Sequence, residues 1–227
     1  MSATVATAVA AENGTRTQRL FAALPLPDNA VSDLAEVVSD LNIARRTGTP
    51  SGRGGRPGVG TRRPAQSNRL VRSANWHLTV AYLGDVDTER LGEASEVLAA
   101  ACGAFDPLRL CVSGGGRFGR GRYSVVYAGL DGDVARLVQL VHRIRAGLIA
   151  AELPVDQKQY RPHVTLARPG DRVTNQQAAQ DLLTLRRYHG PSWTAHDVVL
   201  YKSDYGTKPG GEQPNYTAVA TMPLGTP

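Results

Sequence analysis

A four-residue pattern that occurs twice constrains the fold of this chain more than any other feature. The copies read His-Leu-Thr-Val at 77–80 and His-Val-Thr-Leu at 163–166. Each copy lies in a run with the apolar alternation of a β-strand, in which successive side chains point to opposite faces. We therefore expect each histidine to share a face with its threonine, while the apolar residues are buried on the other face. Two such faces predict a duplicated half-site, in which paired imidazoles act as general acid and general base.

A purely structural alternative is that both histidines lie at the edge of the core and bond only their neighbouring threonines. Random placement of the five histidines and the threonines of this chain would give roughly 0.4 matches to this spacing. The two observed matches, their strand context and their matched apolar partners favour the functional interpretation.

The remaining pattern mixes strands with amphipathic helices, which is typical of an α+β fold. Beyond the two motifs, strands are expected at about 19–26, 108–112, 124–130, 194–203 and 215–222. Helices are expected at about 28–43, 133–151 and 175–187, and another begins at Asp87 or Thr88. Gly114–Gly119 matches the G-x-G-x-x-G pattern of dinucleotide sites, but that pattern must open a helix and here a strand follows. We therefore expect a hairpin loop at this run and no nucleotide cofactor.

The positive charge of the chain is concentrated in one segment. The net charge is +6, yet the stretch between Asp40 and Asp85 carries eight arginines and no acidic residue, which leaves −2 for the remainder. Its part at about 45–69 is rich in Gly, Pro, Ser and Arg and cannot bury a core, so we expect a flexible insertion. This segment is either a tolerated surface insertion or an arginine-rich arm that holds RNA phosphates.

Several features bear on the cellular setting. No apolar run approaches the length of a membrane-spanning helix. Residues 1–18 lack the basic start and strongly apolar stretch of a signal peptide, so a disordered tail is expected. Cys102 and Cys111 fit no metal or redox spacing and indicate a reduced, cytoplasmic protein, a disulfide being the less favoured alternative. Because both half-sites lie on one chain, we expect a monomer.

The chain resembles the two-histidine (2H) phosphoesterase superfamily and, within it, the bacterial RNA 2',3'-cyclic phosphodiesterases, also called 2'-5' RNA ligases. The resemblance covers residues 19–224 and is carried, in chain order, by RLFAALPLPDNAVSDLAEVV, NWHLTVAYLGDVD, YSVVYAGL, QYRPHVTLAR, VVLYKSDYG and YTAVATMPL. It implies one bilobal domain with two similar lobes, each an antiparallel sheet with flanking helices, around a central cleft. The insertion at about 45–69 departs from the family pattern, in which this connection is usually shorter.

The resemblance also implies a role for each motif residue. His77 stands where the family has its proton donor and His163 where it has its proton acceptor, while Thr79 and Thr165 stand where it has phosphate-binding hydroxyls. The implied reaction is hydrolysis of a 2',3'-cyclic phosphate at a single-stranded RNA 3' end, tRNA fragments included, to a 2'-phosphate. Family members can also join RNA ends through a 2'-5' linkage. Imidazoles that titrate near about pH 6.5 can serve as acid and base without a metal ion, and the sequence lacks H-E-x-x-H and the acidic cluster of two-metal nucleases.

Six further residues are candidates for contact with substrate: two arginines around the second motif, two residues of a closing strand and two aromatic residues, namely Arg161, Arg168, Tyr201, Ser203, Phe21 and Tyr127. Strand alternation from His163 places Arg161 on the motif face and Arg168 on the opposite face. The two aromatic rings can stack an RNA base, although a place in the core fits each of them equally well. Weaker candidates follow the glycine run, at Arg117, Arg120 and Arg122.

Two other functions remain open on the sequence. A phosphodiesterase for a small cyclic nucleotide-type phosphate would use the same histidine pair, because the motifs bind the phosphate and not the base. A non-catalytic RNA-binding protein would instead rely on the arginine-rich arm, and the intact His/Thr pairs argue against it.

Overall fold

The computed structural model describes residues 17–44, 70–119, 125–168, 174–204 and 213–225. Its strands form one sheet in the order β6-β3-β4-β5-β2-β1-β7-β8, and every neighbouring pair is antiparallel. The strands are β1 (Thr17–Pro25), β2 (His77–Asp87), β3 (Leu108–Phe118), β4 (Val125–Gly132), β5 (Val164–Ala167), β6 (His189–Ala195), β7 (Asp197–Asp204) and β8 (Asn215–Pro223). The helices are α1 (Asp28–Asp40), α2 (Leu91–Cys102), α3 (Val134–Ala150) and α4 (Asn175–Arg187). The expected α+β class is confirmed.

The sheet consists of two four-stranded halves that meet at the motif strands. One half contains β2, β1, β7 and β8, and the other contains β5, β4, β3 and β6. The halves join where β2 pairs with β5, with Leu78 opposite Val164. Because this pairing is antiparallel, the same register sets Thr79 opposite His163 and His77 opposite Thr165. The fold thus brings two tetrapeptides that are 86 residues apart in the sequence onto adjacent strands.

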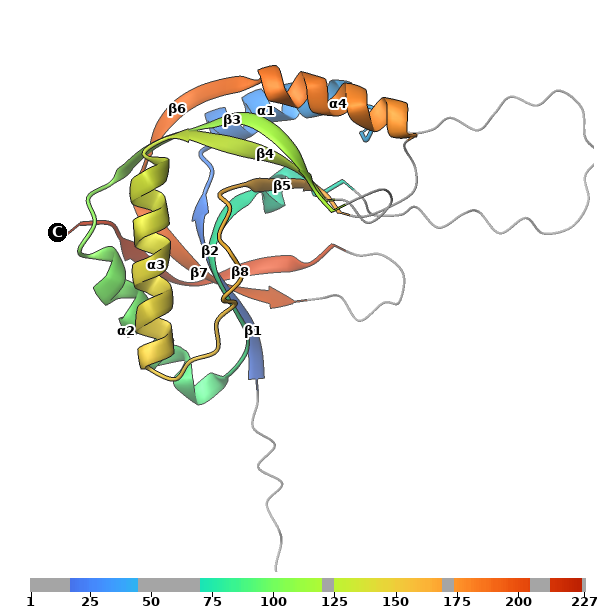
Figure 1. Cartoon of the computed structure of the whole chain (residues 1–227). Helices are drawn as coiled ribbons and strands as arrows, with labels where there is room; N and C mark the ends of the chain where they lie inside the picture. The colour runs from blue at the N-terminus through green and yellow to red at the C-terminus, as the bar shows by residue number, and fades with distance from the viewer. Residues whose placement is uncertain (1–16, 45–69, 120–124, 169–173, 205–212, 226–227) are drawn as a thin grey trace, which may run out of the picture.

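Each half of the sheet is covered by its own pair of helices, as Figure 1 shows. Helices α2 and α3 pack on each other and against β8 and β2, whereas α1 and α4 pack against β6 and β3. The buried face of α3 contains Leu137, Val141, Ile144 and Leu148, at the spacing expected of an amphipathic helix. On β2 and β5, in the middle of the sheet, the histidine and threonine side chains of the motifs are partly exposed.

A buried carboxylate ties the two helices of the second half together. Asp181, on α4, is only 2% exposed. Its Oδ1 accepts hydrogen bonds from the backbone N and the Nδ2 of Asn42, both at 2.8 Å, and its Oδ2 accepts one from the backbone N of Ile43 at 3.1 Å. These donors follow the end of α1, so the carboxylate fixes the exit of that helix against α4. The N-terminus of α4 is closed by a capping box formed by Thr174 and Gln177.

The structure corrects several expected element bounds. The single strand expected at 194–203 is two strands, because the chain breaks its pairing at His196: β6 pairs with β3 at one edge of the sheet, and β7 pairs with β1 and β8 in the other half. Helix α1 ends at Asp40, earlier than expected, and a short 3-10 turn at Thr88–Arg90 precedes α2. The first strand begins at Thr17, so the last two residues of the expected 1–18 tail belong to β1.

The glycine run expected to form a hairpin loop instead lies within strand β3, up to Phe118. Gly114 has a φ of 68° beside an irregularity in the pairing with β4, a conformation that glycine adopts without strain. A Cβ at Gly116 would lie 2.5 Å from the hydroxyl of Tyr127. The glycines therefore allow the Tyr127 ring to lie directly over the neighbouring strand.

Some expectations fall on segments that lie outside the described residues: the greater part of the tail, the insertion at 45–69, and Arg120 and Arg122. Among the helices that the structure describes, none is long and apolar enough to cross a membrane.

Candidate active site

The two motif strands show the alternation that the sequence predicts. Leu78 and Val80 on β2 are 0% and 1% exposed, and Val164 and Leu166 on β5 are both 0% exposed. The histidine and threonine of each motif lie on the opposite, partly exposed face. With Thr79 opposite His163 and His77 opposite Thr165, the four polar side chains form a compact group. Directly opposed residues on antiparallel strands have Cβ atoms about 4.5–5.5 Å apart.

Each imidazole is held by the backbone carbonyl two residues before it. His77 Nδ1 lies 2.8 Å from the Asn75 oxygen, and His163 Nδ1 lies 2.7 Å from the Arg161 oxygen. Because a carbonyl oxygen can only accept, Nδ1 carries the hydrogen in both rings. The neutral rings therefore present an unprotonated Nε2. In His77 this atom lies 3.0 Å from the Thr79 hydroxyl, which donates to it.

Aromatic rings pack around both histidines. Around His77, the ring centroids of Phe21 and Tyr216 lie at 4.8 and 5.4 Å. Around His163, those of Phe118 and Tyr127 lie at 4.9 and 5.7 Å. The two halves of the sheet thus surround their histidines in the same way, and the rings exclude water from one side of each imidazole.

This packing changes the acid–base properties of the rings. Burial lowers the pKa of His77 to about 4; the Asn75 carbonyl opposes this shift, and the positive charges of Arg168 and His163 add to it. Burial also lowers the pKa of His163, again against the hydrogen bond to its backbone carbonyl. Both histidines are therefore neutral near pH 7 when the site holds no anion.

A hollow of about 580 Å³ opens beside His163. Thr79 and His163 form part of its lining, together with four cationic side chains, those of Arg145, Lys158, Arg161 and Arg168. Its one acidic side chain, Asp156, already forms an ion pair with Lys158 at 3.5 Å. The hollow is therefore positively charged and suits an anionic ligand. His77 lines a second, smaller hollow of about 240 Å³ with Tyr201 and Tyr216.

The six substrate-contact candidates differ in their placement. Arg161 and Arg168 both line the larger hollow, so the expectation that strand alternation turns Arg168 away is wrong. The cause is local: β5 ends at Ala167, and its pairing with β4 contains an irregularity, so alternation does not extend to Arg168. Ser203 lies near the end of β7, opposite Tyr216, and lines neither hollow.

The aromatic candidates contact the histidines or their neighbours. Phe21 is 5% exposed and stacks on Tyr201 with a centroid distance of 5.3 Å, behind His77. Tyr127 stacks on Phe118 at 4.2 Å, beside His163. Arg117, the one described member of the weaker arginine candidates, is exposed and lines neither hollow.

The sequence does not predict several residues that line or surround the site. They carry no motif and come from separate segments: Phe118, Tyr216, Arg145, Lys158, Tyr160 and Tyr82. The one available signal is the helical position of Arg145, which places it on the partly exposed side of α3. Within the described residues, the grouping of His, Cys and carboxylate side chains suited to a metal ion does not include either motif histidine.

Comparisons with known proteins agree with this geometry. Residues 56–207 match the sequence model of the 2'-5' RNA ligase superfamily. The RNA 2',3'-cyclic phosphodiesterases of Geobacillus stearothermophilus and Aeropyrum pernix are 26% identical over 157 residues and 30% identical over 101 residues. These alignments cover 68% and 44% of this chain but 47% and 56% of the relatives, so the chain spans about half the length of the curated relatives it matches.

Solved structures share the whole fold. Escherichia coli LigT complexed with 3'-AMP superposes with a TM-score of 0.65 at 21% identity, covering 92% of this chain and 99% of that one. The protein TT0787 of Thermus thermophilus gives 0.64 at 22% identity, covering 91% and 97%. The family match extends over more than half of the chain and includes both motifs, so the resemblance noted in the sequence is confirmed: this chain belongs to the 2'-5' RNA ligase superfamily of 2H phosphoesterases.

Proposed function

We propose that this protein hydrolyses 2',3'-cyclic phosphate ends of RNA to 2'-phosphates with its histidine pair and without a metal ion. The observation that carries the proposal is the register of β2 and β5, which sets Thr79 opposite His163 and His77 opposite Thr165. Each histidine directs Nε2 away from its bonded carbonyl, and four cations line the adjacent hollow. The two relatives named RNA 2',3'-cyclic phosphodiesterase support the same activity.

The reaction divides its two proton transfers between the rings. His163 accepts a proton at Nε2 from the attacking water, whose oxygen bonds to phosphorus. The bond from phosphorus to the 3' oxygen breaks, and His77 donates a proton from its Nε2 to that oxygen. The product carries a 2'-phosphate and a free 3'-hydroxyl, and solvent restores the starting protonation of both rings. Thr79 and Thr165 donate hydrogen bonds to the phosphate oxygens on which negative charge increases in the transition state.

The lowered pKa of His77 requires an explanation, because a proton donor must first hold a proton. Burial disfavours the charged ring in the free protein, and the positive charge of Arg168 adds to this effect. A bound cyclic phosphate carries a negative charge that offsets Arg168 and favours the imidazolium form. In this mechanism His77 takes up its proton together with the substrate, so protonation of the donor is coupled to binding.

We also propose that the protein joins RNA ends and that it acts as a cytoplasmic monomer. The same groups, with acid and base exchanged, would join RNA ends through a 2'-5' linkage, as the superfamily's name indicates. Single-stranded RNA ends, tRNA fragments included, are the proposed partners, bound at the positively charged hollow. A cytoplasmic monomer is consistent with two unpaired cysteines and with both half-sites on one chain.

The test is hydrolysis of a short RNA that ends in a 2',3'-cyclic phosphate, with EDTA present and the product end identified. Wild-type protein should give a 2'-phosphate, and His77→Ala and His163→Ala should each lose about 10²–10⁴-fold in rate. His142→Ala, at an exposed position on α3, is the matched control and should keep wild-type activity. Turnover of a nucleoside 2',3'-cyclic phosphate but not of RNA would indicate a small-molecule phosphodiesterase. RNA binding without turnover would contradict the enzymatic proposal.

A further inference from the structure

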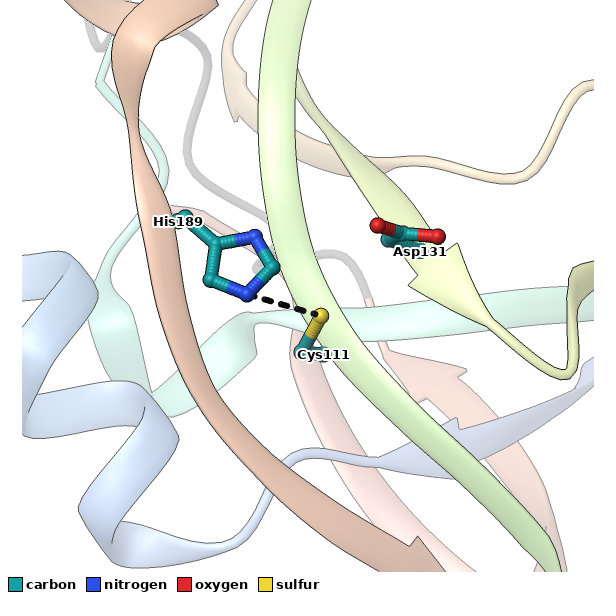
Figure 2. Close-up of side chains that lie close together, drawn as sticks. All are labelled: Cys111, Asp131 and His189. Carbon is teal, nitrogen blue, oxygen red and sulfur yellow. Dashed lines mark hydrogen bonds between the residues drawn. The ribbon is translucent and has the colours of Figure 1, made fainter.

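Three potential metal ligands meet on the second half of the sheet, outside the histidine pair. Cys111 on β3, Asp131 on β4 and His189 on β6 place one ligand atom each within 4.8 Å of the others (Figure 2). Cys111 Sγ lies 3.9 Å from His189 Nε2. The register explains the meeting, because Cys111 pairs with Asp131 across one side of β3 and Ser113 pairs with His189 across the other.

We propose that these three side chains bind one Zn²⁺ ion, with the fourth coordination position open to solvent. Thiolate, imidazole and carboxylate are the usual protein ligands of zinc. Tetrahedral coordination with Zn–S near 2.3 Å and Zn–N near 2.0 Å requires a sulfur-to-nitrogen distance of about 3.5 Å. The observed 3.9 Å needs an adjustment of a few tenths of an ångström. Asp131 is exposed, so its carboxylate can rotate toward the ion.

The surroundings of the three ligands suit a metal. His189 Nδ1 lies 3.0 Å from the Ser113 hydroxyl, which can accept its hydrogen and leave Nε2 unprotonated toward Cys111. Such outer hydrogen bonds orient the histidine ligands of known metal sites. Burial, together with the charge of Asp131, raises the pKa of the Cys111 thiol, while the Asp131 backbone N–H and the Ser192 hydroxyl favour the thiolate. A bound Zn²⁺ would replace the thiol proton and so offset the raised pKa.

The site is accessible and carries the appropriate charge. A hollow of about 250 Å³ opens over Cys111, Asp131 and His189, and gives an ion a route from solvent. Two carboxylates, those of Asp131 and Asp133, line it against one cation, Arg109. One competing contact is present, since the backbone N of Gly132 donates to Asp131 Oδ1 at 2.7 Å, but the second carboxylate oxygen can still bind.

The ion would act on the fold and not on the reaction. Asp131 lies four residues along β4 from Tyr127, which corresponds to about 13 Å of strand. None of the three ligands lines the hollow beside His163. A shared ion would fasten β6, the edge strand of the sheet, to β3 and β4. RNA hydrolysis should therefore survive removal of the metal, whereas thermal stability should fall.

The test is a Zn²⁺ titration of the metal-free full chain against a chromophoric chelator, repeated with Co²⁺ to detect thiolate-to-cobalt absorption. Wild type should bind one ion, and Cys111→Ser, Asp131→Asn and His189→Gln should each bind at least 10-fold more weakly. Ser113→Ala should weaken binding about 10–100-fold through the orientation of His189. At 100-fold excess over the dissociation constant, zinc should raise the melting temperature of wild type by about 5 °C or more.

The controls separate this site from other thiols and histidines. Cys102→Ser, at the other free cysteine, and His142→Gln should bind zinc like wild type. The double variant His77→Ala, His163→Ala should also bind normally, which excludes the catalytic pair as the ligand set. Absence of binding by wild type would overturn the proposal, as would equal binding by wild type and Asp131→Asn. Because Asp131 and Ser113 lie outside the core, these two variants decide the question if Cys111→Ser fails to fold. Binding is measured without RNA, so the result does not depend on the proposed hydrolysis.

Discussion

At the scale of single residues, the proposed chemistry depends on how the fold fixes two imidazoles. Backbone carbonyls hold Nδ1 of His77 and His163, and aromatic rings cover one side of each ring. Position and tautomer are thus set before substrate arrives, which removes part of the ordering cost from the reaction. The pKa of His77, by contrast, is set first by burial and then by the groups around the ring, among which Arg168 is the cation with the largest effect.

Replacing Arg168 should therefore change the titration of His77. Arg168→Gln removes the cation with the largest effect on His77, so the pKa of His77 should rise from its value of about 4 in the free protein. An NMR titration of the imidazole carbon-bound protons measures this directly. Arg161→Gln removes a neighbouring cation that does not act on His77 and is the matched control. A rise of equal size in both variants, or no rise in Arg168→Gln, would contradict the electrostatic assignment.

The same lowered pKa links folding stability to pH. The pKa of His77 is about 4 in the folded protein and about 6.5 in the unfolded chain, so the unfolded state binds more protons between these values. As the pH falls from about 6.5 to about 4, protonation of His77 in the unfolded chain therefore lowers the free energy of unfolding by about 2–3 kcal/mol. Above about pH 6.5 this loss of stability is absent. Burial of His163 contributes in the same direction.

Urea unfolding of wild type and His77→Gln at several pH values between 4 and 7.5 measures this contribution. It is the difference between the two proteins in the slope of the free energy of unfolding against pH. The variant should lose less stability on acidification than wild type, while Ser39→Ala, on the exposed side of α1, should keep the wild-type slope. Parallel curves for wild type and His77→Gln would show that the ring is not desolvated in solution.

The sequence predicts much of the arrangement of the individual site residues. Alternation along HLTV and HVTL predicts correctly which side chains of both motifs are buried. The same rule fails at Arg168, because it assumes a regular strand where β5 has already ended. The aromatic contacts of Phe118 and Tyr216 could not be predicted, since they depend on which strands become neighbours.

At the scale of elements, the helices owe their placement to a few specific polar contacts as well as to their apolar faces. Asp181 is the main example, because it connects α4 to the residues that follow α1. Removing a buried acceptor leaves its donors without partners, and that desolvation cost exceeds the value of an average hydrogen bond.

Asp181→Ala should therefore destabilise the protein by about 2–4 kcal/mol, because the backbone N–H groups of Asn42 and Ile43 lose their acceptor. Chemical denaturation monitored by circular dichroism measures the change. Asp181→Asn retains one acceptor oxygen and nearly the same shape, so it should cost less. Glu96→Ala, an exposed acidic residue of α2, should change stability by under about 0.5 kcal/mol. A loss in Asp181→Ala no larger than that in Glu96→Ala would refute the structural role.

Helices with a clear apolar period were predictable, whereas one strand was not. The face of α3 stands out in the sequence because its apolar residues recur every three or four positions. Strand β6 reads HGPSWTA, which contains Gly190 and Pro191 and lacks regular alternation. The sequence pattern therefore does not predict its first five residues and joins its last two to β7. Its pairing along β3 depends on tertiary contacts and carries little local signal.

At the scale of the whole molecule, two halves of one sheet meet at a single seam and build the site there. The seam is the pairing of β2 with β5, which aligns one motif against the other. The repeated motif predicts two related halves, and the sheet order confirms this. No local pattern predicts that Leu78 lies opposite Val164, because register between segments so distant in sequence is decided by the packing of the complete fold.

The central claim is that the two histidines divide the proton transfers, and the leaving group offers its most direct test. The measurement compares hydrolysis of a 2',3'-cyclic phosphate RNA with that of an analogue in which sulfur replaces the 3' bridging oxygen, at neutral pH with EDTA. A thiolate leaves readily without a proton, since thiols have pKa values near 8.5. His77→Ala should therefore lose about 10²–10⁴-fold on the oxygen substrate but recover most of that loss on the sulfur analogue, while His163→Ala should remain impaired on both. Equal impairment of His77→Ala on both substrates, or rescue of His163→Ala instead, would contradict the account.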